Sequence, residues 1–186
     1  YIWHKDTDLG GVHAVLVPGG FSYGDYLRAG AIARLSPVMH AVAQFAEAGG
    51  LVMGICNGFQ ILCEAGLLPG ALIRNDCLEF RCINQWVAIE NSNERFNPNK
   101  CGDELLLPIA HGEGNYRLEK DELQNLESNN QVLLRYKGNP NGSLNDIAGI
   151  RNLDGNVYGM MPHPERAVEV YHPSKDGLAI LHAFFE

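Results

Sequence analysis

The sequence predicts an α/β protein in which a mostly parallel central sheet is flanked by helices in three layers, with a small antiparallel insertion. Two observations lead to this prediction. The apolar runs "HAVLV" (residues 13–17) and "LVMGI" (51–55) are each followed by glycines and then by apolar residues at helical spacing. Because this alternation implies crossovers between parallel strands, any site should lie at the carboxyl ends of these two strands.

The first half of the chain supports this reading element by element. Residues 18–20, Pro-Gly-Gly, stop the first strand. A helix is then expected to begin at Ser36 and Pro37, with serine as its N-cap, and to run to the glycines at 49–50. The second strand ends at Cys56, and residues 57–65 again show helical spacing.

The second half is less regular. Residues 71–111 contain four shorter apolar runs with little helix between them, "ALIRN", "LEFRCINQ", "WVAIEN" and "LLLPIAHG", which predict the antiparallel insertion. Residues 118–128 predict a short charged helix, and "QVLLRYK" and "IAGIRN" predict strands. We expect Ser174 to cap a C-terminal helix whose core-facing residues are Leu178, Leu181, Phe184 and Phe185.

Composition restricts the classes of function. The 186 residues fit one domain, 1–186, and the net charge of −8 disfavours nucleic acid or an anionic membrane as a partner. No apolar stretch reaches the length of a membrane span and no signal-peptide pattern is present, so we expect a cytoplasmic location. The five cysteines include no C-x-x-C pair, which argues against a disulfide framework or a zinc site, so we expect reduced thiols and no metal.

The stretch "MGICNGFQ" carries the clearest chemical signal. Gly54, Cys56 and Gly58 form G-x-C-x-G at a strand end, the pattern of a nucleophile elbow with sulfur in place of oxygen. A thiol at a helix N-terminus meets the positive end of the helix dipole, which is expected to lower its pKa. A buried cysteine at a strand end is more often an inert apolar residue, so the elbow needs partners to be convincing.

His163 and Glu165, in "PHPE", are the candidate partners. In an extended segment their side chains lie on the same side of the chain, and the two prolines stiffen it. His163 would be the base and Glu165 the group that orients it. A single histidine in a loop is usually just solvated; the combination with Cys56 favours catalysis.

A thiol that attacks a carbonyl also needs donors for the oxyanion. The backbone N–H of Asn57, directly after the nucleophile, is one candidate, and a second is expected from the turn containing Gly20 and Phe21. The alternative is that these glycines only turn the chain.

Four motifs in order, "VPGGFSYGDYLRAGAIAR", "GICNGFQIL", "PIAHGEGNY" and "GMMPHPERA", resemble the class I, triad-type glutamine amidotransferases, and among them the glutaminase subunits of bacterial phosphoribosylformylglycinamidine synthase. The resemblance covers nearly the whole chain. It implies a flavodoxin-like, three-layer fold. The family pattern begins with a further strand and helix, and we expect the domain at residues 1–186 to lack both.

The resemblance also implies a reaction and partners. Cys56 would attack the side-chain amide of glutamine to give a thioester and ammonia, with Gln60 contacting the substrate. Ammonia would pass to a large synthetase subunit in purine (IMP) biosynthesis, which acts with a small accessory subunit. ATP and magnesium would bind that partner, so no cofactor is expected on this chain.

Several assignments stay open at this stage. His111 and Glu113 could form a second dyad, although a positioning or interface role is favoured. The loop of residues 21–28, with Tyr23, Asp25, Tyr26 and Arg28, could be a docking surface or a solvated loop. The alternatives to an amidotransferase are a γ-glutamyl or cysteine peptidase on the same scaffold, or a non-catalytic interaction fragment.

Overall fold

The computed structural model describes residues 1–25, 27–90, 95–96 and 98–185. Its strands are β1 (Ala14–Val17), β2 (Leu51–Ile55), β3 (Ala71–Ile73), β4 (Arg81–Ile89), β5 (Glu104–His111), β6 (Asn115–Arg117), β7 (Val132–Tyr136), β8 (Ile147–Arg151) and β9 (Val157–Met160). Its α-helices are α1 (Pro37–Glu47), α2 (Asn57–Glu64), α3 (Pro98–Cys101), α4 (Lys120–Ser128) and α5 (Gly177–Phe185). Four short 3₁₀ turns lie at Ser22–Asp25, Ala33–Leu35, Leu144–Asp146 and Pro164–Arg166.

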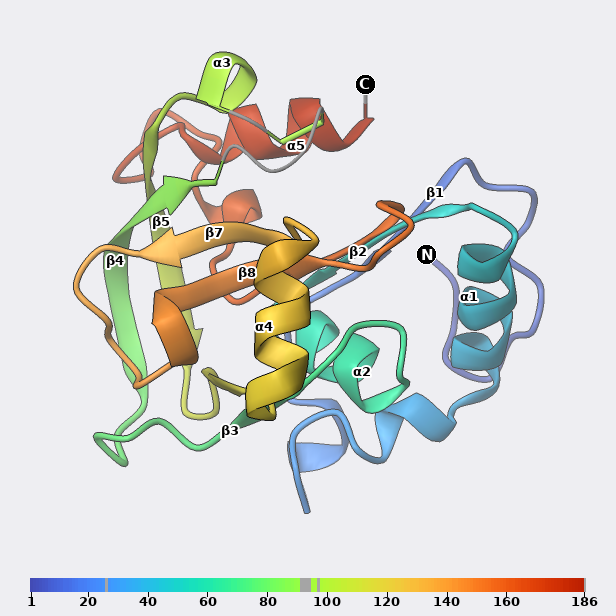
Figure 1. Ribbon diagram of the computed structural model, residues 1–186. Coiled ribbons are helices and arrows are strands. Elements are labelled where there is room, and N and C mark those ends of the chain that lie inside the picture. Colours follow the sequence, from blue (N-terminus) through green and yellow to red (C-terminus); the bar gives the residue numbers. More distant parts are fainter. Residues whose placement is uncertain (26, 91–94, 97, 186) are drawn as a thin grey trace.

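Seven strands form one curled sheet in the order β1-β2-β9-β8-β7-β4-β5, and β3 pairs with β6 in a separate two-stranded sheet. In Figure 1, α3 and α5 lie above the main sheet and α2 lies below it, so the chain has the three layers that the sequence predicts. The carboxyl end of β2 leads directly into α2, as expected of a strand–helix unit.

The sheet is mixed rather than mostly parallel, which corrects one part of the predicted fold. Among the strands of the described residues, only β1 with β2 and β2 with β9 pair in parallel. The pairs β9·β8, β8·β7, β7·β4 and β4·β5 are antiparallel. The prediction failed here because β7 and β8 are almost wholly buried, and strands buried on both faces are typical of parallel sheets.

The predicted insertion is a long hairpin. Its first strand, β4, runs without a break from Arg81 to Ile89, where the sequence suggested two separate strands. The polar Gln85 in its middle obscured the pattern. Gln85 is buried because its side-chain amide donates to the carbonyls of Trp86 and Lys137. Asn91, the last residue of the predicted run "WVAIEN", lies outside the described residues.

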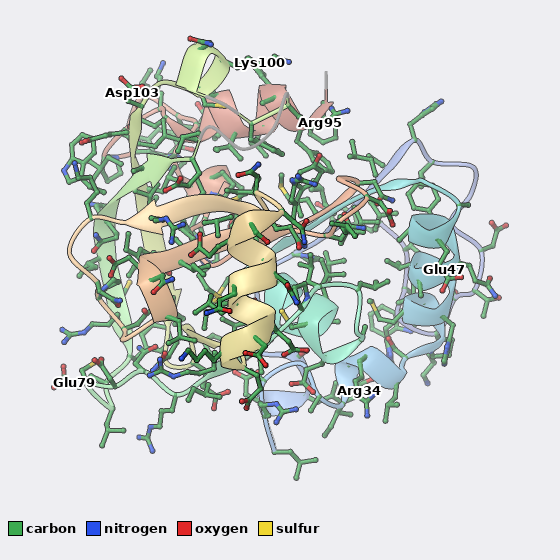
Figure 2. All side chains as sticks on the ribbon, in the orientation of Figure 1. Arg34, Glu47, Glu79, Arg95, Lys100 and Asp103 are labelled. Carbon is green, nitrogen blue, oxygen red and sulfur yellow. The ribbon has the colours of Figure 1, made fainter. Side chains whose placement is uncertain are left out.

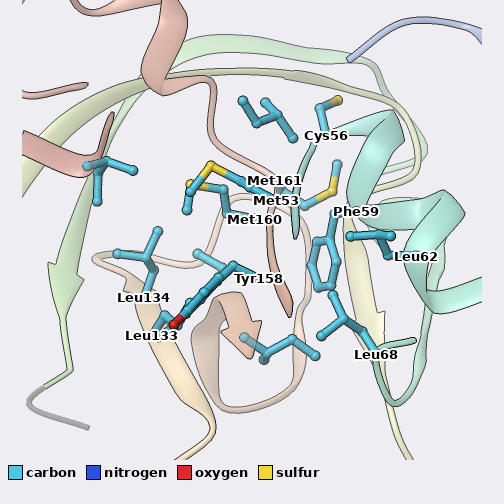
Figure 3. Close-up of a cluster of buried hydrophobic side chains, with 14 of the residues drawn as sticks. Met53, Cys56, Phe59, Leu62, Leu68, Leu133, Leu134, Tyr158, Met160 and Met161 are labelled. Atoms are coloured by element: carbon cyan, nitrogen blue, oxygen red, sulfur yellow. The ribbon is translucent and has the colours of Figure 1, made fainter. Parts of the chain in front are cut away.

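The buried core lies between the sheet and its helices. Its largest fully buried side chains include Tyr116, Tyr158, Phe59, Phe96 and Phe184. Figure 3 shows one part of this core, where Cys56 lies at one end of a cluster that also contains Met53 and Met161. Charged side chains such as Arg34 and Glu47 lie around the periphery of the molecule (Figure 2).

The ends of two helices differ in detail from the prediction. Ser36 precedes Pro37 at the start of α1, but its hydroxyl donates back to the Ala33 carbonyl instead of capping the helix. Ser174 likewise donates to the Leu106 carbonyl and does not cap α5, which begins at Gly177. In α5, Phe184 is buried as expected, whereas Phe185 is exposed.

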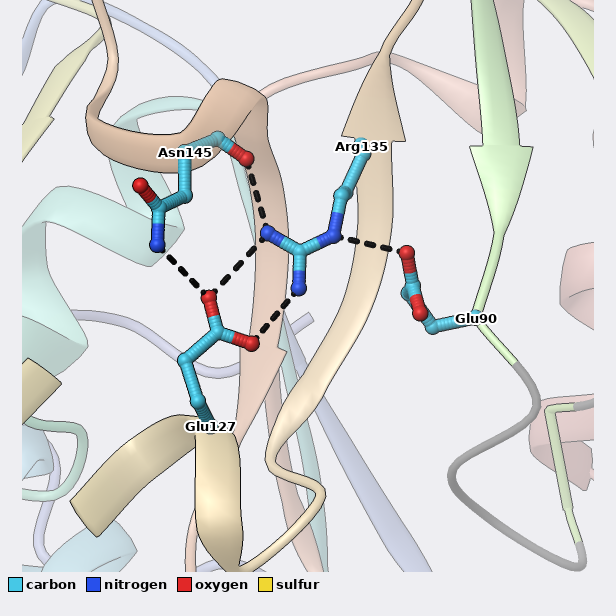
Figure 4. Close-up of polar contacts among 4 residues, drawn as sticks. All are labelled: Glu90, Glu127, Arg135 and Asn145. Carbon is cyan, nitrogen blue, oxygen red and sulfur yellow. Dashed lines mark hydrogen bonds and ion pairs between the residues drawn. The ribbon is translucent and has the colours of Figure 1, made fainter. Parts of the chain in front are cut away.

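An arginine cluster ties α4 to the antiparallel half of the sheet (Figure 4). Arg135 on β7 donates to Glu127 of α4 through two nitrogens, to Glu90 through Nε, and to the Asn145 carbonyl. Burial by itself would raise the pKa of Glu127, but the hydrogen bonds from Arg135 and Asn145 outweigh it and hold the pKa below its usual value. The cluster therefore depends on an ionised Glu127.

Candidate active site

Cys56 stands at the turn between β2 and α2 with backbone angles φ 50° and ψ −106°, a strained conformation for a residue with a side chain. Gly54 and Gly58 beside it leave no room for a side chain, because backbone atoms lie too close. A β-carbon on Gly54 would lie 2.6 Å from the Gly58 carbonyl carbon, and one on Gly58 would lie 1.9 Å from the Val17 carbonyl oxygen. The G-x-C-x-G spacing thus lets α2 pack directly against two strands, and the predicted elbow is present.

The thiol of Cys56 is held in its protonated form. Its side chain is 6% exposed, and Sγ donates to the Ala110 carbonyl oxygen at 3.6 Å. Burial raises the pKa of Cys56 to about 11, although the backbone N–H of Asn57 acts in the opposite direction. The expectation that the helix N-terminus lowers this pKa is therefore wrong, because loss of hydration outweighs the hydrogen bond from the first N–H of the helix.

The imidazole of His163 is oriented by Glu165. Nδ1 lies 2.6 Å from Glu165 Oε1, although residues 164–166 form a 3₁₀ turn and not the extended segment expected. The backbone N–H of His163 donates to the Pro108 carbonyl on β5. A carboxylate only accepts, so Nδ1 donates to Glu165, which leaves Nε2 as the ring nitrogen that can serve as the base. No described residue hydrogen-bonds to that buried Nε2.

Gly19 shows how closely the thiol and the imidazole approach one another. A β-carbon built on Gly19 would lie 2.8 Å from His163 Cε1 and 3.6 Å from Cys56 Cβ. The two side chains come from elements more than 100 residues apart, and both lie beside Gly19. The structure thus brings the Cys56, His163 and Glu165 side chains together as a nucleophile, its base and an orienting group require, although the Cys56 thiol donates to Ala110 and not to His163.

The oxyanion donors predicted from sequence lie beside this group. Asn57 is 2% exposed, and its N–H faces the sulfur closely enough to affect the Cys56 pKa. The Asn57 side chain is fixed on both sides, since Oδ1 accepts from the Ser22 N–H and Nδ2 donates to Gln60 Oε1. Gly20 lines a cavity that also contains Cys56, and a β-carbon built on Gly20 would meet no atom within 4 Å.

Gln60 lies on the cavity wall, one turn along α2 from the nucleophile. Both ends of its amide have partners: Oε1 accepts from Asn57, and Nε2 donates to the Glu113 carbonyl at 2.6 Å. The contact between Gln60 and substrate stays a prediction. In the structure this side chain joins the nucleophile helix to the segment that follows β5.

The cavity beside Cys56 has a volume of about 160 Å³. Its rim carries two aromatic rings, Phe21 and Phe80, whose centroids are 6.1 Å apart. Its wall also carries two carboxyl groups, Asp25 and Glu113. Burial, and then the charge of Glu113, raise the pKa of Asp25. Such a wall suits a small ligand with a positively charged group.

Sequence reasoning placed Asp25 in a docking loop and missed its position in the cavity, because its backbone φ of 53° turns the chain in a way that no sequence pattern indicates. Phe21, Tyr23 and Leu27 of this loop are exposed, as a docking surface would require. Arg28 pairs instead with Glu64 of α2. Tyr26 lies outside the described residues.

His111 is the other residue whose role sequence reasoning left open. It ends β5, lines the cavity and is 3% exposed. Glu113 is not its catalytic partner: the Glu113 carboxylate accepts from the Ala29 N–H, whereas His111 Nδ1 contacts Asn75 Oδ1 at 3.2 Å. The two side chains therefore do not form a dyad.

Among the described residues, no group of three or more histidine, cysteine, aspartate or glutamate side chains is arranged to hold a metal ion. In the same residues, no helix has the length and apolar character needed to cross a membrane. All five cysteines lie in the described part of the chain, and none forms a disulfide.

Comparison with known proteins gives consistent matches. The profile of the CobB/CobQ-like glutamine amidotransferase domain matches residues 2–176. The phosphoribosylformylglycinamidine synthase subunit PurQ of Synechococcus elongatus is 59% identical over 186 residues, 100% of this chain and 84% of that protein. The subunit of the same name from Lacticaseibacillus casei is 61% identical over 175 residues, 94% of this chain and 77% of that protein.

A solved structure also matches along nearly the whole chain. It is described as "Structure of PurLQS from Thermotoga maritima", with a TM-score of 0.87 and 42% identity over 97% of this chain and 82% of that one. This likeness confirms the fold class predicted from the sequence, with the mixed sheet described above.

Proposed function

The chain belongs to the CobB/CobQ-like glutamine amidotransferases, and from this premise we propose that it is the glutaminase subunit of a phosphoribosylformylglycinamidine synthase. The relatives that carry this name match at 59% and 61% identity over 100% and 94% of the chain. The observation that carries the proposal is the position of the Cys56 and His163 side chains, both beside Gly19, together with the hydrogen bond from His163 to Glu165.

In the proposed reaction, Cys56 Sγ attacks the carboxamide carbon of glutamine while His163 Nε2 takes the thiol proton. A thiol with a pKa of about 11 needs this base, because almost none of it is ionised at neutral pH. His163 then donates the proton to the leaving nitrogen, which departs as ammonia, and a γ-glutamyl thioester remains. Water, activated by the same imidazole, hydrolyses the thioester to glutamate and restores the thiol.

The backbone N–H groups of Asn57 and of the Gly20 turn would hold the oxyanion that forms in both steps. Each such donor contributes roughly 3 kcal/mol to the transition state. The cavity wall formed by Asp25 and Glu113 would face the α-ammonium group of glutamine. Phe21 would cover the bound amino acid from the rim, and Gln60 would hold the wall in place from α2.

We further propose that the chain works in the cytoplasm with a large synthetase subunit and a small accessory subunit. The Thermotoga maritima match is described as a PurLQS structure, and five cysteines without disulfides are typical of a reducing compartment. ATP and magnesium would bind the synthetase and activate the acceptor for ammonia, while this chain would use no cofactor of its own.

The test is glutamine hydrolysis by the chain, measured as glutamate and ammonia release with and without the synthetase subunit. Cys56→Ser is expected to abolish ammonia release but leave the complex intact by size-exclusion chromatography. Cys82→Ser, which changes an exposed cysteine, is the matched control and should keep the activity. Retained activity in Cys56→Ser would overturn the proposal, as would a preference for γ-glutamyl peptides over glutamine. We expect weak activity alone and a rise when the synthetase is added.

A further inference from the structure

His111 is a buried histidine whose hydrogen-bonding state can be worked out from its neighbours. The fully buried Asn75 donates through Nδ2 to the carbonyls of Glu79 and His111, and accepts at Oδ1 from the Gly114 N–H. A backbone N–H can only donate and a carbonyl can only accept, so these bonds fix which end of the Asn75 amide is oxygen.

That assignment fixes the tautomer of His111. Nδ1 lies 3.2 Å from Asn75 Oδ1, which only accepts, so Nδ1 carries the proton. Burial, aided by the nearby His163, lowers the pKa of His111 to about 4, so the ring is neutral at physiological pH. Nε2 therefore holds an unprotonated lone pair.

This lone pair is without a partner among the described residues. Nε2 is buried and accepts no hydrogen bond from any of them. Gly114 packs directly on the ring, since a β-carbon there would lie 2.4 Å from Nδ1 and 2.7 Å from Nε2. A buried acceptor that is left unsatisfied costs about 1–3 kcal/mol, which points to a ligand that supplies the donor.

The position of the ring indicates which donor that is. His111 lines the same cavity as Cys56. The residue before it, Ala110, accepts a hydrogen bond from the Cys56 thiol at its carbonyl oxygen. Glutamine differs from glutamate at one atom of the reacting group, where an –NH₂ donor replaces a carboxylate oxygen. Only the amide can donate to a neutral imidazole nitrogen; a carboxylate oxygen would face it with a second lone pair.

We propose that His111 Nε2 accepts a hydrogen bond from the carboxamide nitrogen of the glutamine bound at Cys56, and so selects the amide over the acid. The proposal rests on the glutaminase function proposed above. His111 would take no proton in the reaction: its task is to orient the nitrogen that leaves and to disfavour rebinding of the glutamate product.

The test compares two substrates in the chain assembled with its synthetase. The γ-methyl ester of glutamate passes through the same thioester as glutamine but has no N–H to donate. His111→Asn keeps a donor for Asn75 and removes the acceptor at Nε2. It is expected to lower kcat/KM for glutamine about 10- to 100-fold and to change that for the ester less than about threefold. His111→Gln, which can place an oxygen near the Nε2 position, is expected to restore part of the glutamine activity.

The outcomes separate this inference from the proposed function. An equal loss on both substrates in His111→Asn would overturn the role of His111 while the glutaminase function stands. Absence of glutamine hydrolysis in the unsubstituted chain would overturn the function itself. If the His111 variants do not fold, NMR of a protein that keeps His111 tests the same hydrogen bond. In ¹⁵N-histidine-labelled Cys56→Ser, glutamine should shift the Nε2 resonance of His111 and glutamate should not; equal shifts would overturn the proposal.

Discussion

Gly58 offers the sharpest test of the elbow geometry. It lies in the first turn of α2, where a β-carbon would stand 1.9 Å from the Val17 carbonyl oxygen and 2.7 Å from its carbon. Both are backbone atoms, so no side chain can rotate away. In Gly58→Ala, therefore, β1 and α2 would have to separate by about 1.5 Å before ordinary contact distances return.

The size of the effect follows from that displacement. Overpacking of this kind costs about 1–3 kcal/mol, which for a chain of this length lowers Tm by roughly 2–12 °C. The same shift moves the thiol of Cys56, at the start of α2, away from the Gly19–Gly20 turn that follows Val17. A misplacement of about 1 Å in a reacting group can lower the rate about 10²-fold. We therefore expect Gly58→Ala to lose both stability and activity.

Thermal unfolding by circular dichroism and glutamine hydrolysis measure the two effects. The control for stability is Gly112→Ala, because a β-carbon there would meet only Phe80, at an ordinary 3.7 Å. That variant should unfold close to the temperature of the original chain. If Gly58→Ala unfolded there too, the close approach of α2 and β1 would be refuted. A lowered Tm with full activity would refute the link between this contact and the position of the thiol.

Three further predictions concern charge and protonation. Glu165→Gln should lower kcat for glutamine by about 10²- to 10⁴-fold, because His163 loses its orienting carboxylate, whereas the exposed Glu169→Gln should not; equal rates in the two variants would argue against the triad. Alkylation of Cys56, followed by mass spectrometry, should accelerate up to about pH 11, and a plateau below about pH 9 would contradict the burial argument. The raised pKa also means that the protonated thiol stabilises the fold below about pH 8.5 and that this contribution is lost as pH rises through about 11. Arg135→Met should lower the free energy of unfolding by about 1–3 kcal/mol, because Glu127 and Glu90 lose their partner. This loss should become smaller in acid as Glu127, whose pKa is lowered, becomes protonated. Arg34→Met, which changes an exposed arginine, is the control, and equal effects of the two variants would count against the cluster.

The local features of the site could be predicted because they depend on neighbours in the chain. The turn at Cys56 follows from glycines at fixed spacing, and the pairing of His163 with Glu165 follows from their separation by one proline. Both required only the geometry of a few residues.

What could not be predicted depends on residues that are distant in sequence. The Cys56 pKa is set by how deeply the fold buries the sulfur, and no local pattern reports that. The direction of β7 and β8 was missed because burial on both faces hides the alternation that identifies antiparallel strands. The state of His111 was likewise beyond reach, since it is fixed by Asn75, which lies 36 residues away.

Strand β5 is the last strand in the order of the main sheet. On its outer side, backbone carbonyls that could pair with a further strand accept hydrogen bonds from residues of the candidate active site. Pro108 accepts from the amide of His163, and Ala110 accepts from the Cys56 thiol. An edge that would otherwise invite pairing with another polypeptide is thereby occupied. Amide hydrogen exchange at His163 should consequently report how firmly this segment is held on β5, since the amide can exchange only when its bond to Pro108 opens.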